Sequence, residues 1–231
     1  MKVAIMQPYL FAYPGYYQLA ASVDTFVFYD DVNFIKRGYI NRNSILANGE
    51  ALKITFPVVS ASQNRKINEH QFEADFSKVI KSIEHAYGKA PNFDEVFPLI
   101  SAVLTAENRD VTSMCQASVV MVMEYLGLPF RHVLSSAIDY DRDASAAGKL
   151  VSICKTLQAD TYINSIGGMA LYTREQFAEE GLALHFLKMN DVHYVQRKAS
   201  DAFVPYLSMI DPLMWCSRDD VRALLTQYEL V

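Results

Sequence analysis

The chain has 231 residues, of which 51% are apolar and 20% charged, and this composition predicts a well-packed globular protein and excludes a disordered one. Its 21 Lys and Arg stand against 26 Asp and Glu, so the formal net charge is −5 and we expect no specific nucleic-acid partner. No apolar run approaches the roughly 18 residues of a membrane span, and the first strand pattern follows no secretory leader, so we expect a cytoplasmic protein without a membrane span.

Cysteine and histidine spacing gives no sign of a metal site. Cys115, Cys154 and Cys216 lie far apart without a C-x-x-C pair, and the five histidines show no H-x-x-x-H spacing. We therefore expect no metal ligands among them and predict that the cysteines are buried, reduced thiols.

The N-terminal quarter of the chain alternates strand and helix signals and then predicts a hairpin. The pair Asn48-Gly49 lies between two alternating apolar runs, and both central residues of a type I′ turn need a positive φ, which Asn and Gly adopt readily. The predicted elements are a strand over 2–6, a helix over 15–21, a strand over 25–29 and antiparallel strands near 41–47 and 50–59.

The middle of the chain is helical, and the C-terminal part returns to alternation. Apolar residues recur with a period near 3.6 from Phe76 onward. Helices are predicted over 76–87, 92–104, 111–126, 144–157 and 174–180, strands over 161–164 and 182–187, and a short helix from 218. This order predicts a single α/β domain over 1–231: a Rossmann-like, mainly parallel sheet with an antiparallel hairpin and a helical insertion at about 70–130.

The crowded loop after the first strand is the first candidate binding element. Ligands of open α/β sheets bind outside the carboxyl ends of the strands, where Gln7 and Pro8 begin the loop. Gly15 permits close backbone approach at the start of the next helix, whose free N–H groups favour an anion such as a phosphate. Tyr13 and Tyr16 flank it as candidate binding residues. The alternative is that the aromatic rings only wedge the loop onto the core.

The second strand ends in Asp30 and Asp31 at the same edge of the sheet. Their carboxylates suit a ribose, an ammonium group or Mg²⁺, and the alternative is a solvated turn. A basic stretch follows, in which Arg and Lys alternate with amides, a pattern typical of phosphate or carboxylate capture. We name Asp30, Asp31 and Lys36 as candidate catalytic residues, and Arg37, Asn41 and Arg42 as candidate ligand-binding residues.

A second glycine-rich stretch follows the strand over 161–164. Gly167 and Gly168 could let a backbone approach a ligand beside Asn164, and a plain tight turn is the alternative. Further on, Asp211 precedes Pro212, which is typical of a turn.

These stretches resemble the WbqC-like family. The resemblance runs in order through KVAIMQPYLFAYPGYYQL, DTFVFYDDVNFIKRGYINRN, ICKTLQADTYINSIGGMALY and YLSMIDPLM. It implies a role in bacterial surface-polysaccharide biosynthesis of the O-antigen type. The chain departs from the family pattern at Ala12, where proline is common, at Tyr39, where tryptophan is common, and at Gly148-Lys149, where a Thr-Arg pair is usual, so no fixed arginine can act there.

A second, fold-level similarity is to nucleotidyltransferases. The first strand, loop and helix resemble the unit in which an H-x-G-H motif binds the phosphates of ATP, and Tyr13-Pro14-Gly15-Tyr16 occupies those positions here. Tyrosine carries no positive charge, so adenylyl transfer would need Lys36, Arg37 or Arg42 to supply it.

Two functions remain open from the sequence. The first is a transferase or amide-forming ligase that acylates the amine of a nucleotide-linked amino sugar, with ATP or a nucleotide-linked substrate, and Mg²⁺, as candidate ligands. No G-x-S-x-G stretch or activated cysteine is present, so direct transfer from an activated donor is favoured. The second is a non-catalytic protein that binds a nucleotide sugar or glycan.

Overall fold

A six-stranded, mainly parallel sheet forms the centre of the protein in the computed structural model, which describes residues 1–196 and 202–231. The strand order is β5-β2-β1-β6-β7-β8, and only the β7–β8 pair is antiparallel. The strands are β1 (Lys2–Met6), β2 (Thr25–Phe28), β5 (His132–Leu134), β6 (Thr161–Ser165), β7 (Ala183–Met189) and β8 (Tyr228–Leu230). This confirms the predicted fold class.

The hairpin forms a separate two-stranded sheet of β3 (Arg42–Ala47) and β4 (Glu50–Thr55). Its turn has positive φ at both central residues, 53° at Asn48 and 83° at Gly49, as a type I′ turn requires. The predicted hairpin is therefore confirmed, with β4 ending at Thr55 rather than at 59.

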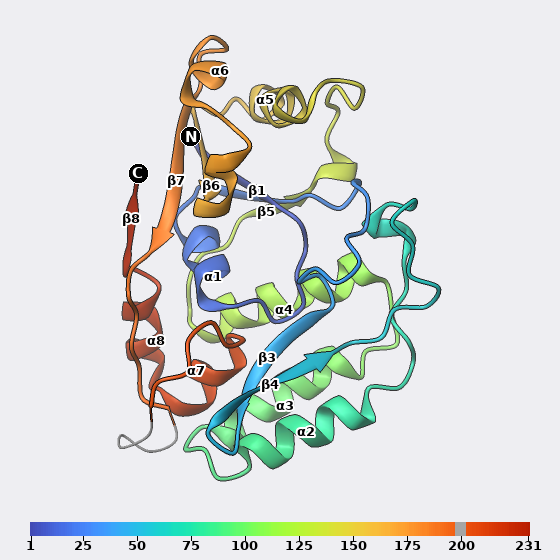
Figure 1. The fold of residues 1–231 in the computed structure, drawn as a ribbon, viewed down its shortest axis with the longest axis vertical. Helices are drawn as coiled ribbons and strands as arrows, with labels where there is room; N and C mark the ends of the chain where they lie inside the picture. Colours follow the sequence, from blue (N-terminus) through green and yellow to red (C-terminus); the bar gives the residue numbers. More distant parts are fainter. Residues whose placement is uncertain (197–201) are drawn as a thin grey trace.

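Eight α-helices surround the sheet and the hairpin in the described residues (Figure 1). They are α1 (Pro14–Ala21), α2 (Ser77–Tyr87), α3 (Phe93–Leu104), α4 (Val111–Tyr125), α5 (Ala146–Thr156), α6 (Arg174–Ala178), α7 (Ile210–Trp215) and α8 (Arg218–Leu224). The helices α2, α3 and α4 follow one another between β4 and β5, within the stretch where an insertion is predicted. The division into one domain stays a prediction.

Two apolar clusters cover the two faces of the sheet. In β1, Ala4 belongs to one cluster while Val3 and Ile5 belong to the other, as expected from the alternation of side chains along a strand. The first cluster joins the sheet to α1, α4 and the helices around the hairpin, and the second joins it to α5 and α6. Figure 1 shows α5 on one side of the sheet and α1 with α4 on the other.

Four elements differ from the sequence prediction. The strands β5 and β8 have only three residues each and were not predicted, so 182–187 is not the last strand. The segment around Asp211 is the helix α7 rather than a turn, because Pro212 lies in its first turn, where no N–H is needed. The glycine pair lies in a short 3₁₀ helix, η3 (Ile166–Ala170).

Candidate functional site

The opening loop is fixed at its start by the helix that follows it. Tyr16, in α1, donates a hydrogen bond from its hydroxyl to the carbonyl of Gln7 at 2.9 Å. Pro8 is buried, while the Gln7 side chain is half-buried. The loop therefore runs from the carboxyl end of β1 to α1, which begins at Pro14, and this hydrogen bond ties its start to the helix.

Tyr13 covers the start of α1. A Cβ atom on Gly15 would lie 2.4 Å from Cε2 of the Tyr13 ring, so only glycine allows the ring to take this position. The first turn of α1 holds no acidic residue, and the side chain of Tyr13 makes no capping hydrogen bond. The absence of a side chain at Gly15 therefore fixes where the Tyr13 ring lies, and a ligand contact by Tyr13 or Gly15 stays a prediction.

The basic stretch packs against this loop. Leu10 donates its backbone N–H to the carbonyl of Ile40 at 3.0 Å, and the Asn43 amide donates to the carbonyl of Phe11 at 2.5 Å. Arg42 donates from Nε to the carbonyl of Gly38 at 3.1 Å, which closes the turn that carries the exposed Lys36 and Arg37. Within residues 1–196 and 202–231, none of these three cations forms an ion pair. Asn41 instead uses its amide internally, donating to the Phe56 carbonyl.

Tyrosines from three parts of the chain meet beside this turn. The rings of Tyr9 and Tyr39 lie 6.4 Å apart, and those of Tyr9 and Tyr16 lie 5.4 Å apart. Burial raises the pKa of Tyr9 to about 12, and the neighbouring phenols of Tyr13 and Tyr39 add to the shift. Burial also raises the pKa of Tyr13, with Tyr206 and Tyr39 as the next causes. We call Tyr9, Tyr13, Tyr39 and Tyr206 the tyrosine cluster; Tyr39 and Tyr206 are 70% and 72% exposed.

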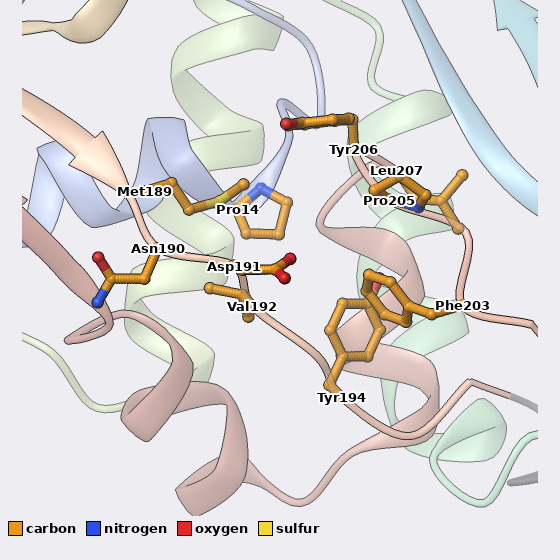
Figure 2. Close-up of a pocket in the computed structure, with 10 residues that line it drawn as sticks. All are labelled: Pro14, Met189, Asn190, Asp191, Val192, Tyr194, Phe203, Pro205, Tyr206 and Leu207. Atoms are coloured by element: carbon orange, nitrogen blue, oxygen red, sulfur yellow. The ribbon is translucent and has the colours of Figure 1, made fainter.

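A cavity of about 320 Å³ adjoins the tyrosine cluster at the carboxyl end of β7. Figure 2 shows Pro14 and Tyr206 on one side, Tyr194 with Phe203 on the other and the Asp191 carboxylate between them. Pro14 and Tyr206 connect the cavity to the cluster. The full lining is Pro14, Met189, Asn190, Asp191, Val192, Tyr194, Phe203, Pro205, Tyr206 and Leu207.

Sequence reasoning missed Asp191. Its side chain is almost fully exposed, and Oδ1 lies 3.4 Å from Nε2 of His193, which is also exposed. Its position in the sequence could have indicated Asp191 as a candidate site residue. Asn190-Asp191 directly follows β7 at the carboxyl edge of the sheet, where ligands of such sheets bind. The prediction ended that strand at Leu187, two residues early, and so did not bring Asp191 to the edge.

A buried clamp holds the two walls of this cavity together. Gln196 donates from Nε2 to the carbonyl of Val204 and accepts the Val204 N–H at Oε1, both at 2.9 Å. Asp211 accepts from Tyr194 and from Gln196 at Oδ2, at 2.8 and 3.2 Å, and from Tyr87 at Oδ1, at 2.8 Å. Burial raises the pKa of the Asp211 carboxyl to about 6, although all three hydrogen bonds favour its charged form.

Asp30 is held by a segment far along the chain. Its carboxylate accepts from the Ser136 backbone at 2.9 Å, from the Ser136 hydroxyl at 2.7 Å and from Asn68 at 3.2 Å. Oγ of Ser135 lies 3.0 Å from Asp30 Oδ1. Asp30 is 1% exposed, so this side chain ties the end of β2 to the 3₁₀ helix η2 (Ser135–Ala137).

The buried carboxylate of Asp31 forms an ion pair with the partly exposed Arg142. Arg142 donates from Nε to Oδ2 at 2.9 Å, while Tyr140 donates to Oδ1 at 2.9 Å and Ser135 at 2.5 Å. The guanidinium also lies over the Tyr140 ring, 4.3 Å from its centre. Neither Asp30 nor Asp31 lines the cavity at the carboxyl end of β7. Their proposed catalytic roles therefore stay predictions, and the geometry gives both a structural role.

The second glycine stretch brings Asn164 and Gly168 together. Asn164 is buried, and a Cβ on Gly168 would lie 2.3 Å from its Nδ2, so the amide occupies the space that glycine leaves open. Gly167 is exposed, with open space around it. A ligand contact by Asn164, Gly167 or Gly168 stays a prediction.

The described part of the chain offers few side chains that could hold a metal ion or a cofactor. No group of three or more His, Cys, Asp or Glu side chains is placed to hold a metal ion there. Phosphates of ATP or of a nucleotide-linked substrate would find Lys36, Arg37 and Arg42. Likewise, no described helix is long and apolar enough to cross a membrane.

Similarity to known protein sequences covers nearly the whole chain. The sequence model of the WbqC-like protein family matches residues 7–223, which include the opening loop, the basic stretch and α7. The chain belongs to the WbqC-like family. The uncharacterized protein Rv1507c of Mycobacterium tuberculosis is 26% identical over 216 residues, which cover 92% of each chain. No solved structure matches.

Proposed function

We propose that this WbqC-like protein is an enzyme of surface-polysaccharide biosynthesis that joins an acyl or aminoacyl group to the amine of a nucleotide-linked amino sugar. One observation supports the proposal: the turn that carries Lys36 and Arg37 also carries Tyr39, whose ring lies 6.4 Å from that of Tyr9, and Tyr206 belongs both to the tyrosine cluster and to the lining of the cavity with Asp191. The polysaccharide context is what the resemblance to the WbqC-like family implies, and the family match over residues 7–223 supports that resemblance.

The parts of this site suit different parts of a sugar nucleotide. Lys36, Arg37 and Arg42 would balance the negative charge of the diphosphate. The Coulomb attraction between a cation and a phosphate grows as the distance between them decreases. The exposed rings of Tyr39 and Tyr206 offer flat faces for a base or a sugar ring, and their hydroxyls offer hydrogen bonds. The amino sugar would then reach the cavity beyond Pro14.

The reaction needs one new bond and one proton acceptor. The amine nitrogen attacks the acyl carbon of an activated donor, a C–N bond forms, and the bond from that carbon to its leaving group breaks. The proton released by the amine passes to a carboxylate. Asp30 or Asp31 is the acceptor predicted from the sequence, and Asp191 is the acceptor that the cavity itself offers.

The test is a search for product with the purified protein. Nucleotide-linked amino sugars are mixed with acyl and aminoacyl donors, and mass spectrometry follows the mass increase of the sugar nucleotide. We expect turnover with at least one pair, and a loss of about a hundredfold or more in Asp191→Asn, as expected when a general base is removed. Asp31→Asn should lower the melting temperature; a large loss of turnover at unchanged stability would instead assign the base to Asp31.

A non-catalytic binding protein is the second candidate, and the hydrogen bonding of the acidic pair favours it. Both carboxylates at the end of β2 are occupied by internal partners, as in a structural turn. Two results together would favour the binding protein over the enzyme. They are saturable binding of sugar nucleotides without product over the whole panel, and unchanged binding in Asp191→Asn.

A further inference from the structure

A second and larger cavity lies between the hairpin and α2, and the proposed function does not use it. Its volume is about 630 Å³, within the range of small-molecule sites. None of its lining residues is shared with the cavity at the sheet edge. We call it the hairpin groove; it is lined by Leu46, Ala47, Asn48, Leu52, Lys81, Ser82, Glu84, His85, Ala86, Gly88, Lys89 and Trp215.

The lining of the hairpin groove includes apolar side chains, among them the chain's single tryptophan. Trp215 is half-buried, and Leu52 of β4 is 42% exposed. Aromatic faces bind the apolar C–H face of a sugar ring or another flat ring. The lining therefore offers an apolar surface to one ring-shaped unit.

The charged side chains that line the groove are more basic than the chain as a whole. Two lysines, Lys81 and Lys89, line it with one acidic residue, Glu84, while the formal net charge of the chain is −5. Across the described ranges, 1–196 and 202–231, neither lysine forms an ion pair. An anionic group on the ligand would match the lysines, while Glu84 and the Asn48 amide can hydrogen-bond to hydroxyl groups.

We propose that the hairpin groove binds an acidic sugar unit of a glycan. The sugar ring lies on Trp215, its carboxylate is held by Lys81 and Lys89, and its hydroxyls bond to Glu84 and Asn48. This assignment goes beyond the transfer reaction at the sheet edge and does not depend on it. It gives the protein a separate site for a polymer or acceptor that carries carboxylates.

Trp215 makes the proposal directly measurable, because no other tryptophan contributes to the emission. The full chain is excited at wavelengths that tyrosine does not absorb and titrated with trigalacturonate. We expect a saturable change in emission, and no change with the fully methyl-esterified trimer, which has the same rings without the charge. Removing both lysines in Lys81→Ala/Lys89→Ala should weaken binding about tenfold or more, as expected when charged hydrogen bonds are lost.

Two controls keep the result specific to the groove. Lys78→Ala removes the same charge from α2 at an exposed position that does not line the groove, and it should bind as the wild type does. Arg37→Ala alters the sheet-edge site and should also leave the titration unchanged. The proposal is overturned if trigalacturonate gives no saturable signal in fluorescence and in calorimetry, if the methyl ester binds equally well, or if Lys78→Ala loses as much affinity as the double variant.

Discussion

Asp211 is a buried carboxylate whose partners in the described chain are all uncharged. Tyr87, Tyr194 and Gln196 donate to it, and Tyr87 also accepts the backbone N–H of Leu46 at 3.0 Å. Burial without a cation penalises the charged form, and the hydrogen bonds offset only part of that cost, so the pKa is raised to about 6. This one side chain therefore links a wall of the hairpin groove to a wall of the sheet-edge cavity.

The raised pKa of Asp211 predicts how stability depends on pH. In the unfolded chain the carboxyl loses its proton at about pH 4, but in the folded chain it keeps it to about pH 6. Between these values the folded state binds more protons, so the free energy of unfolding should fall as the pH rises, by about 3 kcal/mol in total. Urea unfolding at several pH values measures this, and Asp211→Asn should remove that part of the slope.

The comparison with a surface carboxylate isolates the effect. Asp139→Asn, which removes an exposed carboxyl, is the matched control variant. If Asp211→Asn and the wild type show the same slope between about pH 4 and pH 6, the carboxyl does not hold its proton in the folded state.

The adjacent glycines of η3 give a second prediction, with a built-in control. Gly168→Ala would place a Cβ 2.3 Å from Nδ2 of Asn164, whereas at Gly167 the nearest atom, Oγ of Ser165, is 4.0 Å away. Because Asn164 is buried, we expect Gly168→Ala to lower the free energy of unfolding by about 1–3 kcal/mol. Gly167→Ala should stay near the wild type in the same denaturant titration, and equal losses would mean that the amide does not fill this space.

The ends of two neighbouring parallel strands, β2 and β5, are held together by polar side chains. The carboxylate of Asp31 follows β2 and binds Arg142, which follows β5, and Arg142 also donates to the carbonyl of Ile138 at 3.0 Å. Since β2 and β5 are neighbours, this ion pair fixes the connection from β5 to α5 against the sheet.

Removing the cation tests this structural role. Arg142→Ala leaves the buried carboxylate of Asp31 with only Tyr140 and Ser135, so we expect a loss of about 1–3 kcal/mol in the free energy of unfolding. The Arg142 side chain is 39% exposed, and solvent screening keeps the expected value below that of a fully buried pair. Arg131→Ala, at an exposed position, is the matched control. If Arg142→Ala is as stable as the wild type, the ion pair with Asp31 does not stabilise the fold.

Local signals account for the elements that the sequence predicts. The type I′ turn at Asn48-Gly49 and the apolar period of α2 are properties of neighbouring residues, so both were predicted. The strands β5 and β8 exist because a longer neighbour pairs with them, and three residues carry no period of their own. The helix α7 was hidden because Asp-Pro is common both in turns and in the first turn of a helix.

The candidate site is assembled from segments that lie far apart in the chain. The opening loop and the basic stretch were expected to meet, since both follow strands that end at the same edge. The third segment, with Asp191, Tyr194 and Tyr206, could not be placed, because its position depends on the Gln196 clamp and on Asp211. The side chains of the acidic pair lie at the predicted edge, but their burial depends on Ser135, Ser136 and Arg142, more than a hundred residues later.

The salt dependence of ligand binding distinguishes the effect of the cations near the site from the effect of the net charge of the chain. The net charge of −5 repels a sugar diphosphate at long range, so binding has to rely on nearby cations. Arg37 is exposed, and its attraction should be screened as the Debye length falls from about 10 Å at 0.1 M salt to about 3 Å at 1 M. Arg37→Ala should therefore weaken binding of a nucleotide-linked amino sugar about tenfold at low salt and about twofold near 1 M, as measured by calorimetry. Arg131→Ala removes the same charge elsewhere and should show neither loss, and an equal loss in Arg37→Ala at every salt concentration would contradict an electrostatic role for the turn.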